Sequence, residues 1–316
     1  MKHLSLILLI GAAFGQNING VNYVEIVDGS DLQINMVYLS GGEYVMGSPA
    51  KERGRKKDEG PKHTVSLSPF WISSYEITWD IYELFLNNVD QKRVENRGPI
   101  NLDIDGVSSA TMPYVNHNQP GHPVINITQY GASQFCKWLT AKTGNYYRLP
   151  TEAEWEFACR SSTETTYSFG NSGRKINQFG WYKKNSGGKL QKIGLKRPNG
   201  YGLYDMHGNA AEWVLDSYDP EAYIKRKKAA HNPMVRMKAL YPRVVRGGSY
   251  KDSLSNVRSS SRGFSSKRWK QRDPQVPKSL WWHTNAKHVG FRIVRTSGAP
   301  GEDKLYKYWV KPKKEY

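Results

Sequence analysis

Helical spacing occurs in only three stretches of this 316-residue chain, and that scarcity limits the folds open to it. Apolar residues recur at i, i+3 and i+4 after Thr78, Thr128 and Thr151, and threonine is a favourable N-cap. Thr151 and Glu154 match a capping box, and Gly144 is the expected C-cap of the second helix. With so little helix, we predict the α+β class: a single, loop-rich domain ordered by buried aromatic residues and turns.

The remaining regular structure is expected to be short strands. Residues 32–45 largely alternate apolar and polar side chains around Gly41-Gly42, which predicts a hairpin, and 65–72 predicts another strand. The second half is rich in Gly, Asn, Ser and Pro, with short apolar runs at 244–245 and 289–294. No repeat and no long linker divides the chain, so one domain is expected.

The N-terminus has the pattern of a secretory signal peptide. A lysine precedes the apolar run 4–13, and Ala13 and Gly15 occupy the −3 and −1 positions of a cleavage site. We therefore expect residues 1–15 to be removed and the protein to be exported to the periplasm, cell surface or medium; an uncleaved anchor is the alternative. The run is well short of the ~20 residues of a membrane-spanning helix, so no transmembrane segment is predicted.

The net charge of +18 and the pI of about 9.7 indicate a strongly basic surface. Such a charge attracts polyanions: nucleic acid, acidic polysaccharide or an anionic membrane face. Export argues against nucleic acid as a partner. A solvated surface that only maintains solubility is the alternative.

One basic run combines charge with an aromatic ring. It contains Lys267, Arg268, Trp269, Lys270 and Arg272. An indole among cations suits a sulfated or uronic sugar, through charge pairing and stacking, so this run is a candidate ligand-binding site. A solvated loop is the alternative.

The two cysteines are predicted to be buried rather than reactive. Cys136 lies on the apolar stripe of the second predicted helix, and Cys159 follows Trp155 by four residues on the third. Because export would place them in an oxidising compartment, a Cys136–Cys159 disulfide is the alternative.

Six segments occur in the order and spacing of one known family. They are Met36 to Ser48, Tyr75 to Thr78, Tyr147 to Glu156, Asn199 to Trp213, Arg246 to Tyr250, and Gly290 to Arg292. From about residue 35 to 294 the chain resembles the formylglycine-generating enzyme, or sulfatase-modifying factor, family. The resemblance implies one domain related to the C-type lectin fold, at 35–296, between an N-terminal extension at 16–34 and a basic C-terminal tail at 297–316.

The resemblance also implies that the family's catalytic site is degenerate here. Active members hold Cu(I) with two cysteines close after the Gly-Gly-Ser segment and oxidise a sulfatase cysteine to formylglycine. In this sequence those positions are Asp252 and Val257, and Ser249 is the only match. A carboxylate and an aliphatic side chain do not replace soft thiolates for Cu(I), so copper is not expected. The half-cystine partners implied for Cys136 and Cys159 are also missing.

A structural calcium site of the family is better preserved. The resemblance implies side-chain ligands from Asp205 and Glu212 and carbonyl ligands from Gly208 and Ala210. Oxygen-only ligation suits Ca²⁺. The alternative is a turn in which the two carboxylates bind backbone N–H groups without metal.

These observations predict an exported, catalytically inactive member of the family that acts as a binding or assembly module. Its partner would be an acidic or sulfated polysaccharide or an envelope protein. The alternative is an enzyme that generates formylglycine by an unconventional route or performs another oxidation.

Overall fold

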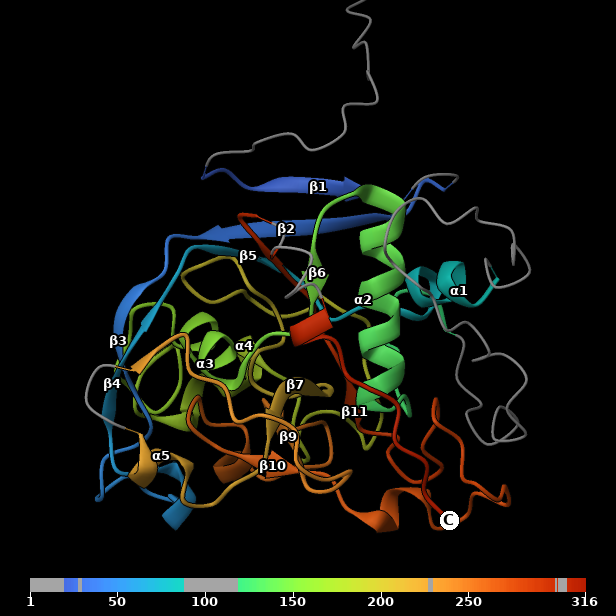
Figure 1. The fold of residues 1–316 in the computed structure, drawn as a ribbon. Helices are drawn as coiled ribbons and strands as arrows, with labels where there is room; N and C mark the ends of the chain where they lie inside the picture. Colours follow the sequence, from blue (N-terminus) through green and yellow to red (C-terminus); the bar gives the residue numbers. More distant parts are fainter. Residues whose placement is uncertain (1–19, 28–29, 88–118, 227–229, 299, 301–305) are drawn as a thin grey trace, which may run out of the picture.

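The computed structural model describes residues 20–27, 30–87, 119–226, 230–298, 300 and 306–316. The predicted signal peptide at 1–15 lies outside these residues. The described chain is a mixed assembly of three sheets, three helices of nine residues or more, and long connecting loops (Figure 1). The α+β, loop-rich class predicted from the sequence is confirmed.

The largest sheet has five antiparallel strands drawn from distant parts of the chain. Their order is β1 (Tyr23–Ile26), β2 (Gln33–Leu39), β5 (Phe70–Ser73), β12 (Val294–Thr296) and β6 (Tyr147–Arg148). Strand β1 and part of β2 belong to the N-terminal extension, which therefore contributes to the sheet.

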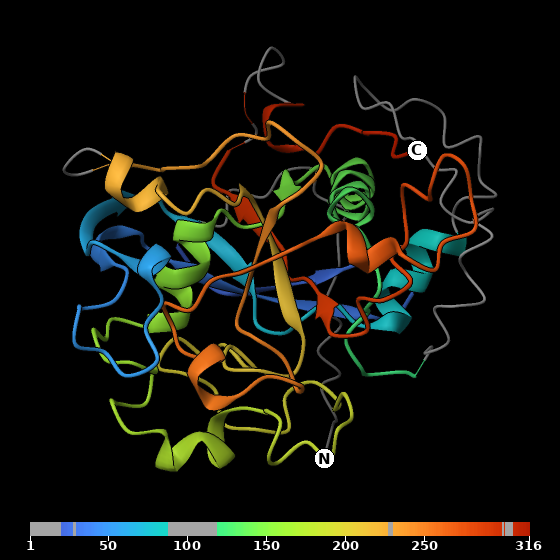
Figure 2. The same ribbon diagram turned by 90° about the horizontal axis from the view of Figure 1, so that it is seen from below.

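Two smaller sheets complete the fold. The first is ordered β10 (Gly263–Phe264), β9 (Arg243–Arg246), β7 (Ala211–Ser217) and β11 (Val289–Gly290). The second is ordered β3 (Gly42–Met46), β4 (His63–Leu67) and β8 (Ala230–His231). Seen from below, β7 crosses the centre of the molecule between helices α2 (Gln129–Thr143) and α3 (Glu152–Arg160) (Figure 2).

The hairpin predicted around Gly41-Gly42 is wrong. Strand β2 pairs with β1 and β5, whereas β3 pairs with β4 and β8, so the two strands belong to different sheets. Both glycines have positive φ (67° and 108°) and turn the chain from one sheet into the other. The strand predicted at 65–72 is likewise two strands, β4 and β5, in different sheets.

The three predicted helices and their caps are confirmed. Helix α1 spans Trp79–Asn87. In α2 the Thr128 Oγ1 accepts from the Gly131 amide at 3.0 Å, and Gly144 closes the helix with φ 74°. The capping box of Thr151 and Glu154 begins α3. Two single-turn helices, α4 (Ile176–Phe179) and α5 (Ala222–Lys225), were not predicted.

Two apolar clusters form the core, and each contains one cysteine. Cys136 lies with α1, α2 and the aromatic side chains between them, and Cys159 lies in the cluster around Trp155. Both thiols are free and buried, as predicted, and they are not joined by a disulfide. Burial raises the pKa of the Cys159 thiol to about 12 and also raises that of Cys136.

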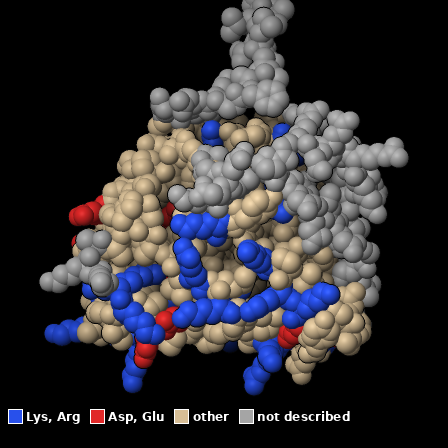
Figure 3. Space-filling model, viewed as in Figure 1, with Lys and Arg blue, Asp and Glu red and all other residues tan. Residues whose placement is uncertain are grey.

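The C-terminal segment 306–316 packs on the domain. The Trp309 indole is buried and donates to the Tyr147 carbonyl at 2.9 Å, and the Val310 amide donates to Ser133 at 2.8 Å. On the face that displays this segment, Lys and Arg side chains far outnumber acidic ones (Figure 3). Within the described residues, no helix combines the length and apolarity needed to span a bilayer.

Candidate functional site

The segment expected to carry catalysis is a tight loop that follows β9. Ser249 donates its hydroxyl to Asp252 Oδ2 at 2.6 Å, and its amide donates to the same oxygen at 2.8 Å. Asp252 Oδ1 accepts from the Asn256 side chain at 3.3 Å. Both carboxylate oxygens of Asp252 are therefore used to shape the loop, which agrees with a turn role for Ser249.

Val257 ends this loop and faces the interior. Its side chain is fully buried against Tyr167 and Ile176. Its carbonyl accepts from Nδ1 of His207 at 2.8 Å, and the His207 Nε2 accepts from the Ser168 amide at 3.1 Å. Burial lowers the pKa of His207 to about 4, so the ring is neutral at pH 7.

The nearest thiol does not supply the missing ligand. Cys159 lies 3.9 Å from the His207 Nε2 and donates to the Met206 carbonyl at 3.7 Å. Its raised pKa keeps it protonated at pH 7, and only a thiolate binds a soft metal well. Asp252, Val257 and Cys159 together therefore offer no pair of thiolates.

The outer side of the same loop forms the floor of an open groove of about 1060 Å³, at Ser253 to Ser255. Four exposed cations line it: Lys51, Arg53, Lys183 and Lys184. None of the four pairs with a carboxylate of the described chain. The two acidic residues of the lining are already engaged, Glu52 with Arg258 at 2.5 Å and Glu164 with Lys62 at 2.8 Å. The groove is therefore positively charged. Its cations come from separate loops, so no local sequence pattern indicates it.

The predicted calcium loop carries more buried carboxylate than the sequence suggested. Asp205 accepts the Gly194 amide on Oδ2 at 2.8 Å, and its Oδ1 is buried without a partner. Glu212 is held by Arg292 through two bonds of 2.7 and 2.8 Å and by the Trp155 indole at 2.7 Å. Glu76 adds a third buried carboxylate, which binds the Ala210 amide at 2.8 Å.

One oxygen of this acidic cluster, Oδ1 of Asp205, is buried without a partner. Burial, reinforced by Glu212, raises the pKa of Asp205 to about 6, and burial together with Asp205 and Glu212 raises that of Glu76 well above its usual range. The unpartnered Oδ1 of Asp205 is an available ligand, whereas Glu212 already neutralises Arg292. No group of three or more His, Cys, Asp or Glu side chains in the described chain would hold a metal alone, so the carbonyls of Gly208 and Ala210 would have to complete a calcium site.

The basic run at 267–272 does not form the face predicted for it. Lys267 to Lys270 make one 3₁₀ turn that directs Trp269 and Lys270 inward. The Trp269 ring packs 5.5 Å from the Trp213 ring and 5.6 Å from that of His283. Lys270 is buried and donates to the Ser279 carbonyl. The structure therefore leaves Trp269 half-buried and Lys270 buried, whereas Lys267, Arg268 and Arg272 are exposed.

Comparison with known proteins matches residues 30–297 to the family model of the sulfatase-modifying factor enzyme 1-like domain. A mouse relative, inactive C-alpha-formylglycine-generating enzyme 2, is 27% identical over 85% of this chain and 88% of its own length. The serine/threonine-protein kinase pkn1 of Chlamydia caviae is 31% identical over 72% of this chain, but the match spans 35% of that relative's length. The solved structure of PvdO from Pseudomonas aeruginosa superimposes with a TM-score of 0.65 at 26% identity, over 87% of this chain and 98% of that one.

Proposed function

This chain belongs to the family of the sulfatase-modifying factor enzyme 1-like domain, and from that premise we propose that it is a non-catalytic member that binds an acidic polysaccharide outside the cytoplasm. The observation that carries the proposal is the groove above Ser253 to Ser255. It lies directly on the loop where the family's cysteines are expected, and its free charges are all positive.

Loss of the oxidative chemistry is supported by what occupies the two cysteine positions. Asp252 bonds within its own loop and Val257 packs in the interior, so neither presents a soft ligand to the groove. The family already includes a relative named as inactive. A direct test is incubation with a Cys-x-Pro-x-Arg peptide and Cu(I), followed by mass spectrometry. Aldehyde formation above the buffer rate would reject the non-catalytic assignment and favour a formylglycine-generating enzyme.

Binding of a polyanion is supported by the charge of the groove and by its volume of about 1060 Å³. Four cations without acidic partners on an open surface attract sulfate or carboxylate groups, and the attraction weakens as salt screens it. The predicted signal peptide is the basis for placing the ligand outside the cytoplasm. An acidic polysaccharide carries repeated negative charges, and the open groove has room for several of its sugar units.

The test is titration with chondroitin sulfate and hyaluronate, with dextran as the neutral glycan, at about 0.05 and 0.5 M salt. Over this range the screening length falls from roughly 14 Å to 4 Å, so the binding should weaken steeply. The variant Arg53→Ala/Lys183→Ala/Lys184→Ala should lose most of the affinity. The matched control Lys267→Ala/Arg268→Ala/Arg272→Ala removes the same charge from another surface and should retain most of it. Equal losses in both variants, or no binding at the lowest salt, would reject the groove and favour an envelope protein as partner.

A further inference from the structure

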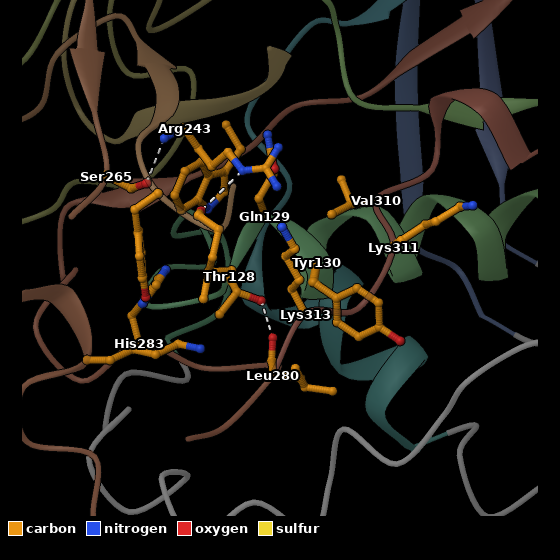
Figure 4. Close-up of a pocket in the computed structure, with 14 residues that line it drawn as sticks. Thr128, Gln129, Tyr130, Arg243, Ser265, Leu280, His283, Val310, Lys311 and Lys313 are labelled. Atoms are coloured by element: carbon orange, nitrogen blue, oxygen red, sulfur yellow. Dashed lines mark hydrogen bonds between the residues drawn. The ribbon is translucent and has the colours of Figure 1, made fainter. Parts of the chain in front are cut away.

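A second, smaller pocket lies between the N-terminus of α2, strand β9 and the C-terminal segment (Figure 4). Its enclosed volume is about 30 Å³, room for about two water molecules or one small ion. Four basic residues line it: Arg243, Lys270, Lys311 and Lys313. The pocket is separate from the groove above Ser253 to Ser255 and shares no lining residue with it.

Arg243 is the unusual residue of this pocket. Its side chain is 3% exposed, yet no carboxylate of the described chain forms a salt bridge with it. Nε donates to the Leu240 carbonyl at 3.2 Å and Nη1 to the Ser217 hydroxyl at 3.4 Å, while Nη2 has no protein partner among the described residues. Burial, with no opposing charge, lowers the pKa of Arg243 to about 10. A cation buried in this way is costly unless an anion joins it.

Two further features add positive charge around the same space. Lys270 is buried, and burial lowers its pKa, although Asp273 and Glu315 offset part of that effect. Thr128, Gln129 and Tyr130, at the start of the 15-residue helix α2, form another wall, and a helix N-terminus carries partial positive charge. Figure 4 shows Arg243 and Lys313 extending into one space, whereas Lys311 points away from it.

We propose that this pocket binds one oxyanion group, a sulfate, phosphate or carboxylate, through the guanidinium of Arg243. The free Nη2 supplies a charge-assisted hydrogen bond. Lys313 adds a second positive charge to the lining, and its ammonium also donates to the Lys238 carbonyl at 2.9 Å. Arg243 also lines a neighbouring open groove of about 500 Å³, together with Arg236 and Tyr308. The oxyanion can therefore be the end of a larger molecule whose body continues along the C-terminal segment.

The first test compares sodium sulfate, phosphate and acetate with sodium chloride at equal ionic strength, by thermal unfolding and calorimetry. At least one oxyanion should raise the melting temperature of the wild type above the chloride value, because a ligand that binds only the folded state stabilises it. Arg243→Met should weaken that binding at least about tenfold, as expected for loss of a hydrogen bond to a charged group. Lys313→Ala should weaken it about threefold, and Lys311→Ala, the matched control, should leave it unchanged.

Two results would overturn the proposal: no difference between the oxyanions and chloride in the wild type, or equal stabilisation of the wild type and Arg243→Met. If Arg243→Met does not fold, the charge reversal Lys313→Glu tests the proposal instead. Lys313 is an exposed residue of the lining, so this substitution should abolish oxyanion binding without changing the core. A second arm titrates N-acetylglucosamine 6-sulfate against N-acetylglucosamine. Tighter binding of the sugar sulfate than of inorganic sulfate would indicate a ligand that extends into the neighbouring groove. Equal affinity would limit the site to the ion.

Discussion

Strand β9 has a buried arginine at each end, and the two differ in whether a carboxylate neutralises their charge. Arg246 contacts Glu156 at 2.6 Å and Glu152 at 3.1 Å, whereas Arg243 has no carboxylate. Because the two are three residues apart on a strand, their side chains point to opposite faces of the sheet. One face carries an arginine paired with two carboxylates, and the other carries an arginine with no carboxylate partner in the described chain. The difference lies in charge pairing, because Arg246 also keeps one buried donor, Nε, without a partner.

The ion pairs on the Arg246 side explain how a loop-rich chain keeps its shape. Glu152 and Glu156 belong to α3. They pair with Arg246 of β9 and with Arg262, which lie about a hundred residues further along the chain. Arg258 is held in the same way by Glu59 at 2.6 Å. The first pairs tie β9 and a loop to helix α3, and the pair of Arg258 and Glu59 ties two loops to each other. Arginines paired with carboxylates therefore hold the structure together, and we infer a ligand site at the buried Arg243 because it lacks such a partner.

The largest change in stability is expected when the same substitution, arginine to methionine, is made at each end of β9. Arg246→Met removes one partner from a buried network and leaves Glu152 and Glu156 less compensated, so it should cost about 3–5 kcal/mol of unfolding free energy. Arg243→Met removes an unpaired buried cation and should change stability by less than about 1 kcal/mol in oxyanion-free buffer. Urea unfolding followed by far-ultraviolet circular dichroism measures both.

The two variants share their chemistry, strand and degree of burial, so each serves as the control for the other. Equal destabilisation would contradict the distinction, because it would mean that Arg243 is as well satisfied by carbonyl and hydroxyl oxygens as Arg246 is by carboxylates.

A smaller effect is expected from acid. Burial alone would raise the pKa of Glu156, but Arg160 and Arg246 more than offset it and hold the pKa below its usual value; Glu154 is lowered in the same way by Arg148. Groups with a depressed folded-state pKa stabilise the protein above the unfolded pKa of about 4.3, and that contribution is lost as the pH falls through the folded value. The contribution of Glu154 and Glu156 to stability should therefore be lost as the pH falls from 5 through their folded pKa values.

The matched variant is Glu156→Gln, which keeps the shape and removes the titration. It should be less stable than the wild type at pH 7 and should lose less stability between pH 5 and pH 3. Parallel pH profiles for the two proteins would show that the acid sensitivity arises elsewhere.

How far the sequence leads can be judged from particular residues. Caps and periodicity are local, so α2 and α3 were predicted with their first residues, and the burial of Cys136 followed from helical spacing. The family motifs identified the domain and the loop at Ser249. The pairing of Gly41 and its neighbours was predicted wrongly, because alternation shows a strand but not the sheet that it joins.

The candidate sites depend more on distant contacts, and there the sequence said less. The sequence did not show that Trp269 is half-buried and Lys270 buried, because a short 3₁₀ turn has no periodicity long enough to mark its inner face. Glu76 stood in a recognised motif, yet nothing local indicated that it would join Asp205 and Glu212. The open Arg243 and the paired Arg246 look identical in sequence, since their partners are set by the fold.

The acidic cluster is the counterpart of the Arg243 pocket, with an unused acceptor in place of an unused donor. If calcium binds at Asp205, it should stabilise the protein by about 1.4 kcal/mol at ten times its Kd. Because the pKa of Asp205 is raised to about 6, protons compete, and the calcium effect should grow as the pH rises from 5 to 7. Melting curves in calcium and in chelator measure this.

Asp205→Asn is the informative variant for the calcium site, because it keeps an acceptor for the Gly194 amide and removes the charge. Glu212→Ala is a poor choice, since it also leaves Arg292 without its carboxylate and would destabilise the protein with or without calcium. Identical melting curves of the wild type in calcium and in chelator at pH 7 would refute the site.

The smallest effect on stability is expected for exposed basic residues, in contrast to the buried, paired Arg246 and the buried, unpaired Arg243. Lys267, Arg268 and Arg272 are exposed beside the buried Lys270, so water solvates their charge. Arg272 also donates to the Asn285 side chain at 3.0 Å and to the Thr284 carbonyl at 3.2 Å. The triple alanine variant should change the free energy of unfolding by no more than about 0.5 kcal/mol, since surface substitutions away from a network rarely do more. Its binding of chondroitin sulfate should fall only slightly, because these side chains lie outside the groove lining. If this variant were destabilised as much as Arg246→Met, exposure and pairing would not explain how much each basic residue contributes to stability. The oxyanion site inferred from the unpaired Arg243 would then lose its basis.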